Sequence, residues 1–230
     1  MAFSHSPKIV TDGLVLCLDA ANTKSYPGSG TNWKDLSGNG NNGTLTNGPT
    51  FDSGNGGSIV FDGVDDFVTI PHDSTQSFSG NFSIEAVIYP TANTANCIIQ
   101  KGSGNDNYQE YWLIQDMRDS NRYFSLIMGK TGNTSANYIY TGNISVVNTF
   151  HHVIATVNGT TATIYVNNVQ EATGTISNRI QSTAALRIGR RVDNFATAAG
   201  KIPTVKLYSR SLTLQEIQQN FNATKGRFGL

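Results

Sequence analysis

Alternating apolar and polar positions are most regular in two β-branched runs between residues 150 and 169. The runs flank Asn158-Gly159, a pair that tolerates the positive φ angles of a type I′ turn, so we predict a hairpin with this pair at its tip. Asn167-Asn168 predicts a second turn into a meander. We place the hairpin at the centre of a larger sheet. The side chains expected on the buried face are Val153, Ala155, Val157, Ala162, Ile164 and Val166.

Further strands follow the same alternation along the chain. The run from Gly13 to Asp19 is apolar on both faces, as expected for a central strand. Pro90 is expected to end the strand that begins at Phe82, and Pro203 predicts the start of the last strand or an edge position. The other strands are expected on both sides of an acidic turn within 58–70, and at 97–101, 111–115, 123–128, 138–140, 186–189 and 202–208.

One helix is predicted, over residues 214–223. Thr213 and Glu216 have the spacing of a capping box at its start, and Gly226 lies beyond its end as a stop. The residues spaced to pack onto the sheet are Leu214, Ile217 and Phe221. The pattern therefore predicts an all-β fold with one short C-terminal helix.

Composition and charge limit the class of partner. Sixteen Lys and Arg balance sixteen Asp and Glu, which argues against broad electrostatic binding to nucleic acid or to an anionic membrane. No apolar run is long enough to span a bilayer, and the residues before Thr11 lack the apolar core of a signal peptide. We therefore expect no nucleic-acid partner, no membrane insertion and synthesis in a cytoplasm.

The cysteines and the adjacent histidines do not predict a metal site. Cys17 and Cys97 each lie in a predicted strand without a Cys or His at ligand spacing. Buried free thiols are favoured over a disulfide, which remains the alternative. His151 and His152 are neighbours on a strand and point to opposite faces, so we expect one packed imidazole and one exposed imidazole.

Several motifs occur in an order that resembles a known family. They lie at residues 13–20, 35–43, 61–68, 82–89 and 207–213, together with the hairpin, where Phe150 stands before the histidine pair. This order resembles the laminin-G-like, concanavalin-A-like jelly-roll family. The resemblance implies an antiparallel two-sheet jelly-roll sandwich over residues 12–225, an N-terminal arm at 1–11 and a C-terminal tail at 226–230.

Oxygen-bearing side chains suggest two candidate calcium sites. Asp35, Asn39 and Asn41 alternate as the ligands of a calcium loop do, although the closing bidentate Glu is absent. The alternative for this segment is a series of Asx turns. Asp62 and Asp65, in the acidic turn, are the second candidates. Calcium is the one cofactor for which the sequence offers ligands.

Two loops combine aromatic and polar residues in the way that sugar sites do, because pyranose rings present apolar faces and polar rims. The candidates are Asn105, Asp106 and Tyr108 in the first loop, and Arg118 and Asp119 in the second. The alternative is that both are ordinary solvated loops.

A glycosidase would need two carboxylates close together in one cleft. The chain has four Glu residues, Glu85, Glu110, Glu171 and Glu216, and none has an acidic residue at i+2 or i+4. Glu85 is expected to face solvent or to be hydrogen-bonded. Since no Gly-x-Ser-x-Gly nucleophile elbow is present either, we predict that the protein is not an enzyme.

The C-terminal run at 215–229 resembles virion proteins of tailed bacteriophages. This resemblance implies a non-enzymatic structural protein on the virion surface, a homo-oligomer that decorates a capsid or tail and binds host-surface glycans. The residues predicted to dock on other virion proteins are Phe3, Arg227, Phe228 and Leu230. The alternatives are a carbohydrate-binding lectin module and, third, a divergent glycoside hydrolase.

Overall fold

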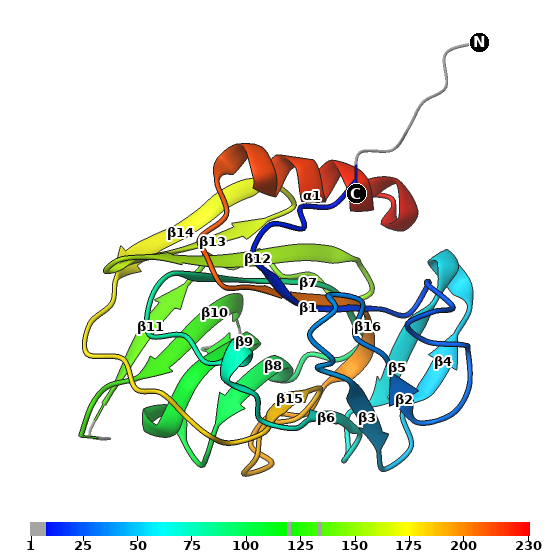
Figure 1. Ribbon diagram of the computed structural model, residues 1–230, viewed down its shortest axis with the longest axis horizontal. Helices are drawn as coiled ribbons and strands as arrows, with labels where there is room; N and C mark the ends of the chain where they lie inside the picture. The colour runs from blue at the N-terminus through cyan, green and yellow to red at the C-terminus, as the bar shows by residue number, and fades with distance from the viewer. Residues whose placement is uncertain (1–7, 119–120, 133–134) are drawn as a thin grey trace.

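Two antiparallel sheets face each other, and one α-helix lies across the outer face of the first (Figure 1). The structure is a computed structural model that describes residues 8–118, 121–132 and 135–230. It confirms the all-β two-sheet sandwich with a C-terminal helix that the hydrophobic pattern predicts.

The first sheet, sheet A, has eight strands. They are β1 (Leu14–Asp19), β4 (Thr50–Asp52), β5 (Ser58–Asp62), β7 (Phe82–Pro90), β12 (His151–Asn158), β13 (Thr161–Val166), β14 (Val169–Thr175) and β16 (Ala199–Tyr208). Their order is β14-β13-β12-β7-β16-β5-β4, and β1 pairs with the second half of β16.

The second sheet, sheet B, also has eight strands. They are β2 (Asn32–Trp33), β3 (Gly43–Thr46), β6 (Phe67–Ile70), β8 (Asn96–Gly102), β9 (Gln109–Arg118), β10 (Asn121–Gly129), β11 (Ala136–Tyr140) and β15 (Leu186–Ile188). Their order is β11-β10-β9-β8-β15-β6-β3-β2. Three short 3-10 helices lie in connections: η1 (Gly54–Gly56), η2 (Ser74–Gln76) and η3 (Asp106–Tyr108).

The main core fills the space between the two sheets. All six side chains predicted for the buried face of the hairpin lie in this core. Alternation determines this outcome, because successive strand residues point to opposite faces and only one face meets the other sheet.

The turn of the predicted hairpin is shifted by one residue. Asn158 pairs with Thr161, so Gly159 and Thr160 form the tip. Only Gly159 has a positive φ, 58°, as in type II′ turns, which place glycine first. The type I′ pattern occurs instead at Asn167-Asn168, where φ is 49° and 68°. The hairpin strands β13 and β12 are the second and third strands from one end of sheet A, so the predicted central position of the hairpin is wrong.

Two further predictions about strand position are wrong. β1 is buried but pairs only with β16, and at its other edge it bonds to the loop at 35–41 rather than to a second strand. Pro203 lies inside β16, in the middle of sheet A, where the register with β7 shifts between Lys201 and Thr204. An irregularity of this kind accommodates a residue that has no N–H to donate.

Helix α1 (Leu214–Phe228) has the predicted capping box and ends at Gly229, whose φ is 68°. It continues past the predicted stop at Gly226, so residues 226–228 belong to the helix rather than to a tail. Its buried stripe is Ile217, Asn220, Thr224 and Phe228, whereas Leu214 is 65% exposed, contrary to the prediction. Among the described residues, no helix combines the length and the apolar character needed to cross a bilayer.

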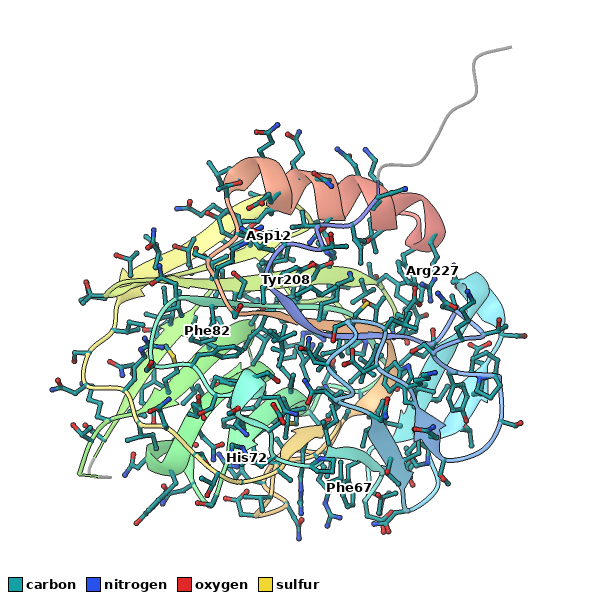
Figure 2. The ribbon with its side chains drawn as sticks, viewed as in Figure 1. Asp12, Phe67, His72, Phe82, Tyr208 and Arg227 are labelled. Carbon is teal, nitrogen blue, oxygen red and sulfur yellow. The ribbon has the colours of Figure 1, made fainter. Side chains whose placement is uncertain are left out.

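A buried network of polar side chains fixes α1 to sheet A. Glu85 Oε1 accepts hydrogen bonds from Lys206 Nζ at 2.5 Å and contacts His152 Nε2 at 3.0 Å. Its other oxygen accepts from Asn220 of α1 at 2.6 Å and from Tyr208, which Figure 2 labels beneath the helix. Burial opposes the charged form of Glu85, but Lys206 and His152 outweigh it and lower its pKa to about 2.

Both adjacent histidines are buried. They point to opposite faces, as predicted: His151 packs against Phe124, with ring centroids 5.4 Å apart, and His152 contacts Glu85. Burial lowers the pKa of His151. The expectation that one imidazole is exposed is wrong, because α1 covers the outer face of sheet A.

Cys17 and Cys97 are free and buried, as predicted. Burial raises the pKa of Cys17 to about 11 and that of Cys97 to about 12. Both thiols are therefore protonated at neutral pH and poor nucleophiles.

Candidate functional site

The outer face of sheet B is the broad sheet surface that no described α-helix covers (Figure 1). Four aromatic side chains on this side are at least 39% exposed: Tyr108, Tyr138, Tyr140 and Phe195. Tyr138 and Tyr140 belong to β11, and Phe195 packs edge-on against Trp112 of β9. Exposed aromatic rings of this kind offer apolar faces to a ligand.

Helix η3 places Tyr108 on this face. Asn105 caps η3 by accepting a hydrogen bond from the Asn107 N–H at 3.1 Å. A Cβ on Gly129 of β10 would lie only 2.1 Å from the Asn107 carbonyl oxygen. Glycine at this position therefore allows the loop to lie directly on the sheet, with Tyr108 at its end.

Asp106 holds the neighbouring elements together. Its Oδ1 accepts a hydrogen bond from the Arg191 guanidinium at 2.5 Å, and its Oδ2 accepts from the Tyr138 hydroxyl at 2.9 Å. Asp106 therefore positions Arg191 and Tyr138, and its role as a sugar contact stays a prediction.

Arg191 in turn fixes the exposed Phe195. The guanidinium carbon lies 4.5 Å from the centre of Trp112 and 4.4 Å from the centre of Phe195. Asp193 also pairs with Arg191, at 2.6 Å. A buried cation stacked between two rings and neutralised by two carboxylates keeps Phe195 rigid while leaving it 65% exposed.

An open groove of about 650 Å³ lies beside Tyr108. We call it the Tyr108 groove, and its lining residues are Ser103, Tyr108, Thr131, Gly132, Arg179, Ile180, Gln181, Ser182 and Thr183. A second hollow of about 320 Å³ shares residues 181–183 and extends to His72, Ser74 and Ser77. Most of these side chains carry a hydroxyl or an amide, so the lining is polar and largely uncharged.

Glu110 anchors the floor of both hollows. One oxygen accepts from the Phe78 N–H at 2.5 Å, the other from the Ser182 N–H at 2.9 Å, and the Ser77 hydroxyl donates to the same carboxylate at 3.0 Å. Burial raises the pKa of Glu110 against these hydrogen bonds. The carboxylate therefore holds residues 77 and 182 in place.

Lys101 supports the second hollow from beneath. Its Nζ donates to the Ala184 carbonyl at 2.9 Å and lies 3.0 Å from His72 Nδ1; Figure 2 labels His72 on the sheet B side. Burial lowers the pKa of Lys101, although Glu110 and Asp73 oppose that shift. The polar lining of the grooves thus rests on buried, hydrogen-bonded charges.

The first predicted calcium segment is a hydrogen-bonded turn. Asp35 accepts from the Cys17, Ser37 and Asn41 N–H groups and from the Ser37 hydroxyl. Asn39 and Asn41 donate side-chain hydrogen bonds to β1 carbonyls. Because donors occupy the Asp35 oxygens, the structure supports the Asx-turn alternative, and calcium at Asp35, Asn39 and Asn41 stays an untested prediction.

The second predicted calcium segment does gather acidic groups. Asp62 and Asp65 meet Asp66, with ligand oxygens all within 4.8 Å of one another. Asp66 was not among the predicted ligands. This acidic turn joins β5 of sheet A to β6 of sheet B, and the bend brings all three carboxylates together.

The remaining candidate residues are placed as follows. Of the first sugar loop, Tyr108 lines the groove, whereas Asn105 and Asp106 support it. Asp119 and Phe3 lie outside the described residues, and Arg118 is described only by its backbone, at the end of β9. Residues 179–183 follow no regular pattern, so nothing in the sequence marks them as part of a site.

The C-terminal anchors predicted for assembly pack within their own chain. Arg227, which Figure 2 labels near the end of α1, donates to Asp19 at 2.7 Å and to two carbonyls of the η1 loop. Phe228 is 5% exposed and packs against Phe150, with centroids 4.8 Å apart, and Leu230 packs beside this cluster. The segment predicted as a C-terminal tail is therefore docked on its own domain, and an assembly role for these residues stays a prediction.

Fold and site together define a β-sandwich with an aromatic-edged polar groove on its open face. Residues 62–218 match the family model described as the concanavalin A-like lectin/glucanases superfamily, and the chain belongs to this family. The comparison with curated proteins yields no match.

Solved structures show the same fold at low sequence identity. The binding domain of Paraclostridial Mosquitocidal Protein 1 is 18% identical, with a TM-score of 0.69 over 93% of this chain and 52% of the other. The botulinum neurotoxin serotype D ligand binding domain, in complex with N-acetylneuraminic acid, is 13% identical, with a TM-score of 0.71 over 92% and 51%. Trypanosoma rangeli sialidase with the inhibitor DANA is 18% identical, with a TM-score of 0.66 over 95% and 35%. The chain thus spans about half or less of each of these proteins.

Proposed function

We propose that this protein is a carbohydrate-binding module of the lectin type, and that the Tyr108 groove is its glycan site. The observation that carries the proposal is the combination of an exposed aromatic ring with hydroxyl and amide side chains in one open groove. Among the similar structures, two botulinum neurotoxin binding domains are described in complex with N-acetylneuraminic acid and with SialylT. These ligands of other proteins support the same class of ligand here.

The chemistry of the groove fits a sugar ring. Tyr108 is 40% exposed and can cover the apolar C–H face of a pyranose. Thr131, Gln181 and Thr183 surround it with donors and acceptors for ring hydroxyls. Glu110 and Gly129 hold the walls in place before any ligand arrives, which reduces the entropy lost on binding.

The test is an array of neutral and sialylated oligosaccharides, followed by calorimetry with the tightest binder. Tyr108→Ala should weaken that binding by up to about tenfold, since an aromatic stacking contact contributes on the order of 1 kcal/mol. Leu214→Ala, which removes an exposed side chain on α1, is the control and should leave affinity unchanged. Equal affinity of the wild type and Tyr108→Ala would contradict the proposal.

The proposed activity is binding without cleavage. Glu110 is the carboxylate beneath the groove, and its oxygens are committed to Phe78, Ser77 and Ser182. A retaining glycosidase needs a second carboxylate about 5–5.5 Å away, and no other acidic residue lines the groove among the described residues. Release of reducing sugar from any glycan that binds would contradict this part.

Virion display remains a proposal that rests on the resemblance of residues 215–229. A glycan-binding sandwich on a capsid or tail would serve adhesion to a host surface, alone or as a homo-oligomer. Electron microscopy of purified phage particles labelled with an antibody against this chain tests it. Labelled particles are expected, and particles without label would contradict a virion location.

A further inference from the structure

A second feature on the sheet B side is a pair of arginines around one phenylalanine. The Arg187 guanidinium carbon lies 4.8 Å from the centre of the Phe67 ring, and that of Arg190 lies 5.6 Å from it. Phe67 belongs to β6 and Arg187 to the adjacent strand β15; Figure 2 labels Phe67 at this edge of the molecule. Stacking on the ring holds both cations at the same phenylalanine.

These arginines lack the partners that guanidinium groups normally have. No described residue gives Arg187 a hydrogen bond or an ion pair; it stacks on the Phe67 ring, and its electrostatic neighbours are Arg190 and the Cys97 thiol. Arg190 donates one hydrogen bond, at 3.3 Å to the Asp65 carbonyl, while its Nε is buried without a partner. Burial and Arg190 lower the pKa of Arg187. Two neighbouring cations with unused donors favour an anionic acceptor.

The contrast with Arg191 supports this interpretation. Arg191 is also stacked on aromatic rings, but Asp106 and Asp193 both neutralise it. Arg187 and Arg190 have the same stacked arrangement, with no described carboxylate in an ion pair with either. At Arg191 two carboxylates neutralise the stacked cation. At Phe67 the chain provides no such carboxylate for Arg187 and Arg190.

The strand register puts this pair on the same face as the aromatic side chains. Arg187 is opposite Gln100, Gln100 is opposite Trp112, Trp112 is opposite Ile127, and Ile127 is opposite Tyr138. Residues directly opposite each other point to the same side of a sheet. Neighbouring strands lie about 4.8 Å apart, so the four steps from Arg187 to Tyr138 span roughly 19 Å.

We propose that Arg187 and Arg190 form a carboxylate-binding subsite for an acidic sugar, on the same face as the Tyr108 groove. The planar guanidinium groups match the two oxygens of a carboxylate, and the Phe67 ring keeps them in place. The sugar part of this assignment rests on the proposed function, whereas the carboxylate part rests on the arginines alone. A glycan with acidic residues would thus bind at two places on the sheet B side, the Tyr108 groove and the arginine pair.

The direct test is nuclear magnetic resonance of the arginine Nε–H signals during titration with trigalacturonic acid. Its fully methyl-esterified form, which keeps the sugar backbone and loses the charge, is the matched probe. The Arg187 and Arg190 signals should shift with the acid and stay in place with the ester. Equal shifts with the acid and the ester, or no shift with either, would overturn the subsite.

The matched variants are Arg187→Gln/Arg190→Gln and Lys24→Gln/Lys34→Gln, which remove the same two charges at different places. The arginine variant should bind trigalacturonic acid roughly tenfold or more weakly, because charge-assisted hydrogen bonds are lost. The lysine variant, altered at two exposed side chains, should bind as the wild type does. Equal weakening in both variants would mean that net charge alone governs binding and would overturn the assignment.

Two further arms separate the subsite from its alternatives. Tyr108→Ala should leave the arginine shifts unchanged, so a failed Tyr108 groove with intact arginine shifts would contradict only the proposed function. Inorganic phosphate and a short single-stranded DNA should shift the arginine signals less than trigalacturonic acid at equal concentration. Equal or larger shifts would show a general anion or phosphate site and overturn the acidic-sugar assignment.

Discussion

At the scale of single residues, carboxylates in this molecule mostly accept hydrogen bonds inside the fold. Glu85 joins α1 to sheet A, Glu110 holds the groove floor, and Asp106 positions Arg191 and Tyr138. Asp35 fixes a turn. Strand alternation tells which face a side chain occupies, but it does not tell what covers that face, so these roles could not be derived from spacing alone.

Glu85 predicts an acid-sensitive fold. Its pKa is about 2 in the folded protein, against 4.5 for the unperturbed group, because Lys206 and His152 overcome the opposing effect of burial. A carboxyl whose pKa is lower in the folded protein than in the unfolded chain stabilises the fold at pH values above the unfolded-state pKa. This stabilisation is lost as the pH falls from about 4.5 towards about 2. Urea unfolding across this range should show falling stability. Glu216, whose pKa is lowered to about 2 by hydrogen bonds from Arg210, adds to this dependence of the unfolding free energy on pH.

Glu85→Gln tests whether Glu85 causes this pH dependence of the unfolding free energy. The variant leaves Lys206 buried without its anion and should lose about 3–5 kcal/mol of unfolding free energy at pH 7. Its stability should also depend less on pH between about 2 and 4.5. Glu171→Gln, at a partly exposed strand position, is the control and should keep the full slope. An unchanged slope in Glu85→Gln would exclude Glu85 as its source.

The Asp62, Asp65 and Asp66 cluster keeps calcium as a testable prediction. If the cluster binds the ion, added calcium at a hundred times Kd should raise the unfolding free energy by about 2.7 kcal/mol, and a chelator should reverse the gain. Asp65→Asn should remove this response, whereas Asp73→Asn should keep it. A wild-type melting temperature that ignores both calcium and chelator would remove the metal from the account.

At the scale of elements, sequence motifs predict the features that depend on a few neighbouring residues. The capping box at Thr213 and the alternation in β12 and β13 are set within a few residues, and both agree with the structure. The end of α1 was misplaced because an exposed glycine can lie in a helix when Phe228, further along, packs against the sheet. Tertiary packing outweighs the roughly 1 kcal/mol that glycine costs.

Because the C-terminal end of α1 packs on the sheet, we expect Phe228 to contribute to stability. Phe228→Ala should lower the unfolding free energy by about 3–5 kcal/mol, because it leaves a cavity between Val87 and Phe150. Leu214→Ala, at the exposed start of the same helix, should change it by no more than about 0.5 kcal/mol. Chemical denaturation of both variants measures the difference. Equal effects would mean that the C-terminal turn of α1 is not docked.

At the scale of the whole molecule, the sandwich was predictable and the site was only partly so. Alternation over many strands requires two packed sheets, whichever strands pair. The Tyr108 groove, however, is built from residues near 103–108, 131–132 and 179–183, and no local spacing joins segments so far apart. Tyr108 was found because aromatic and polar residues cluster around it, whereas the other wall carries no pattern. Which face is open depends on where α1 packs, which is also a property of the complete fold.

A crystal structure of the protein with its tightest-binding array glycan is the decisive test of the Tyr108 groove as a glycan site. We expect a sugar ring in the Tyr108 groove, with its apolar face against Tyr108 and its hydroxyls hydrogen-bonded to residues 181–183. A glycan bound elsewhere, on the α1 side or at the edges of sheet A, would contradict the claim.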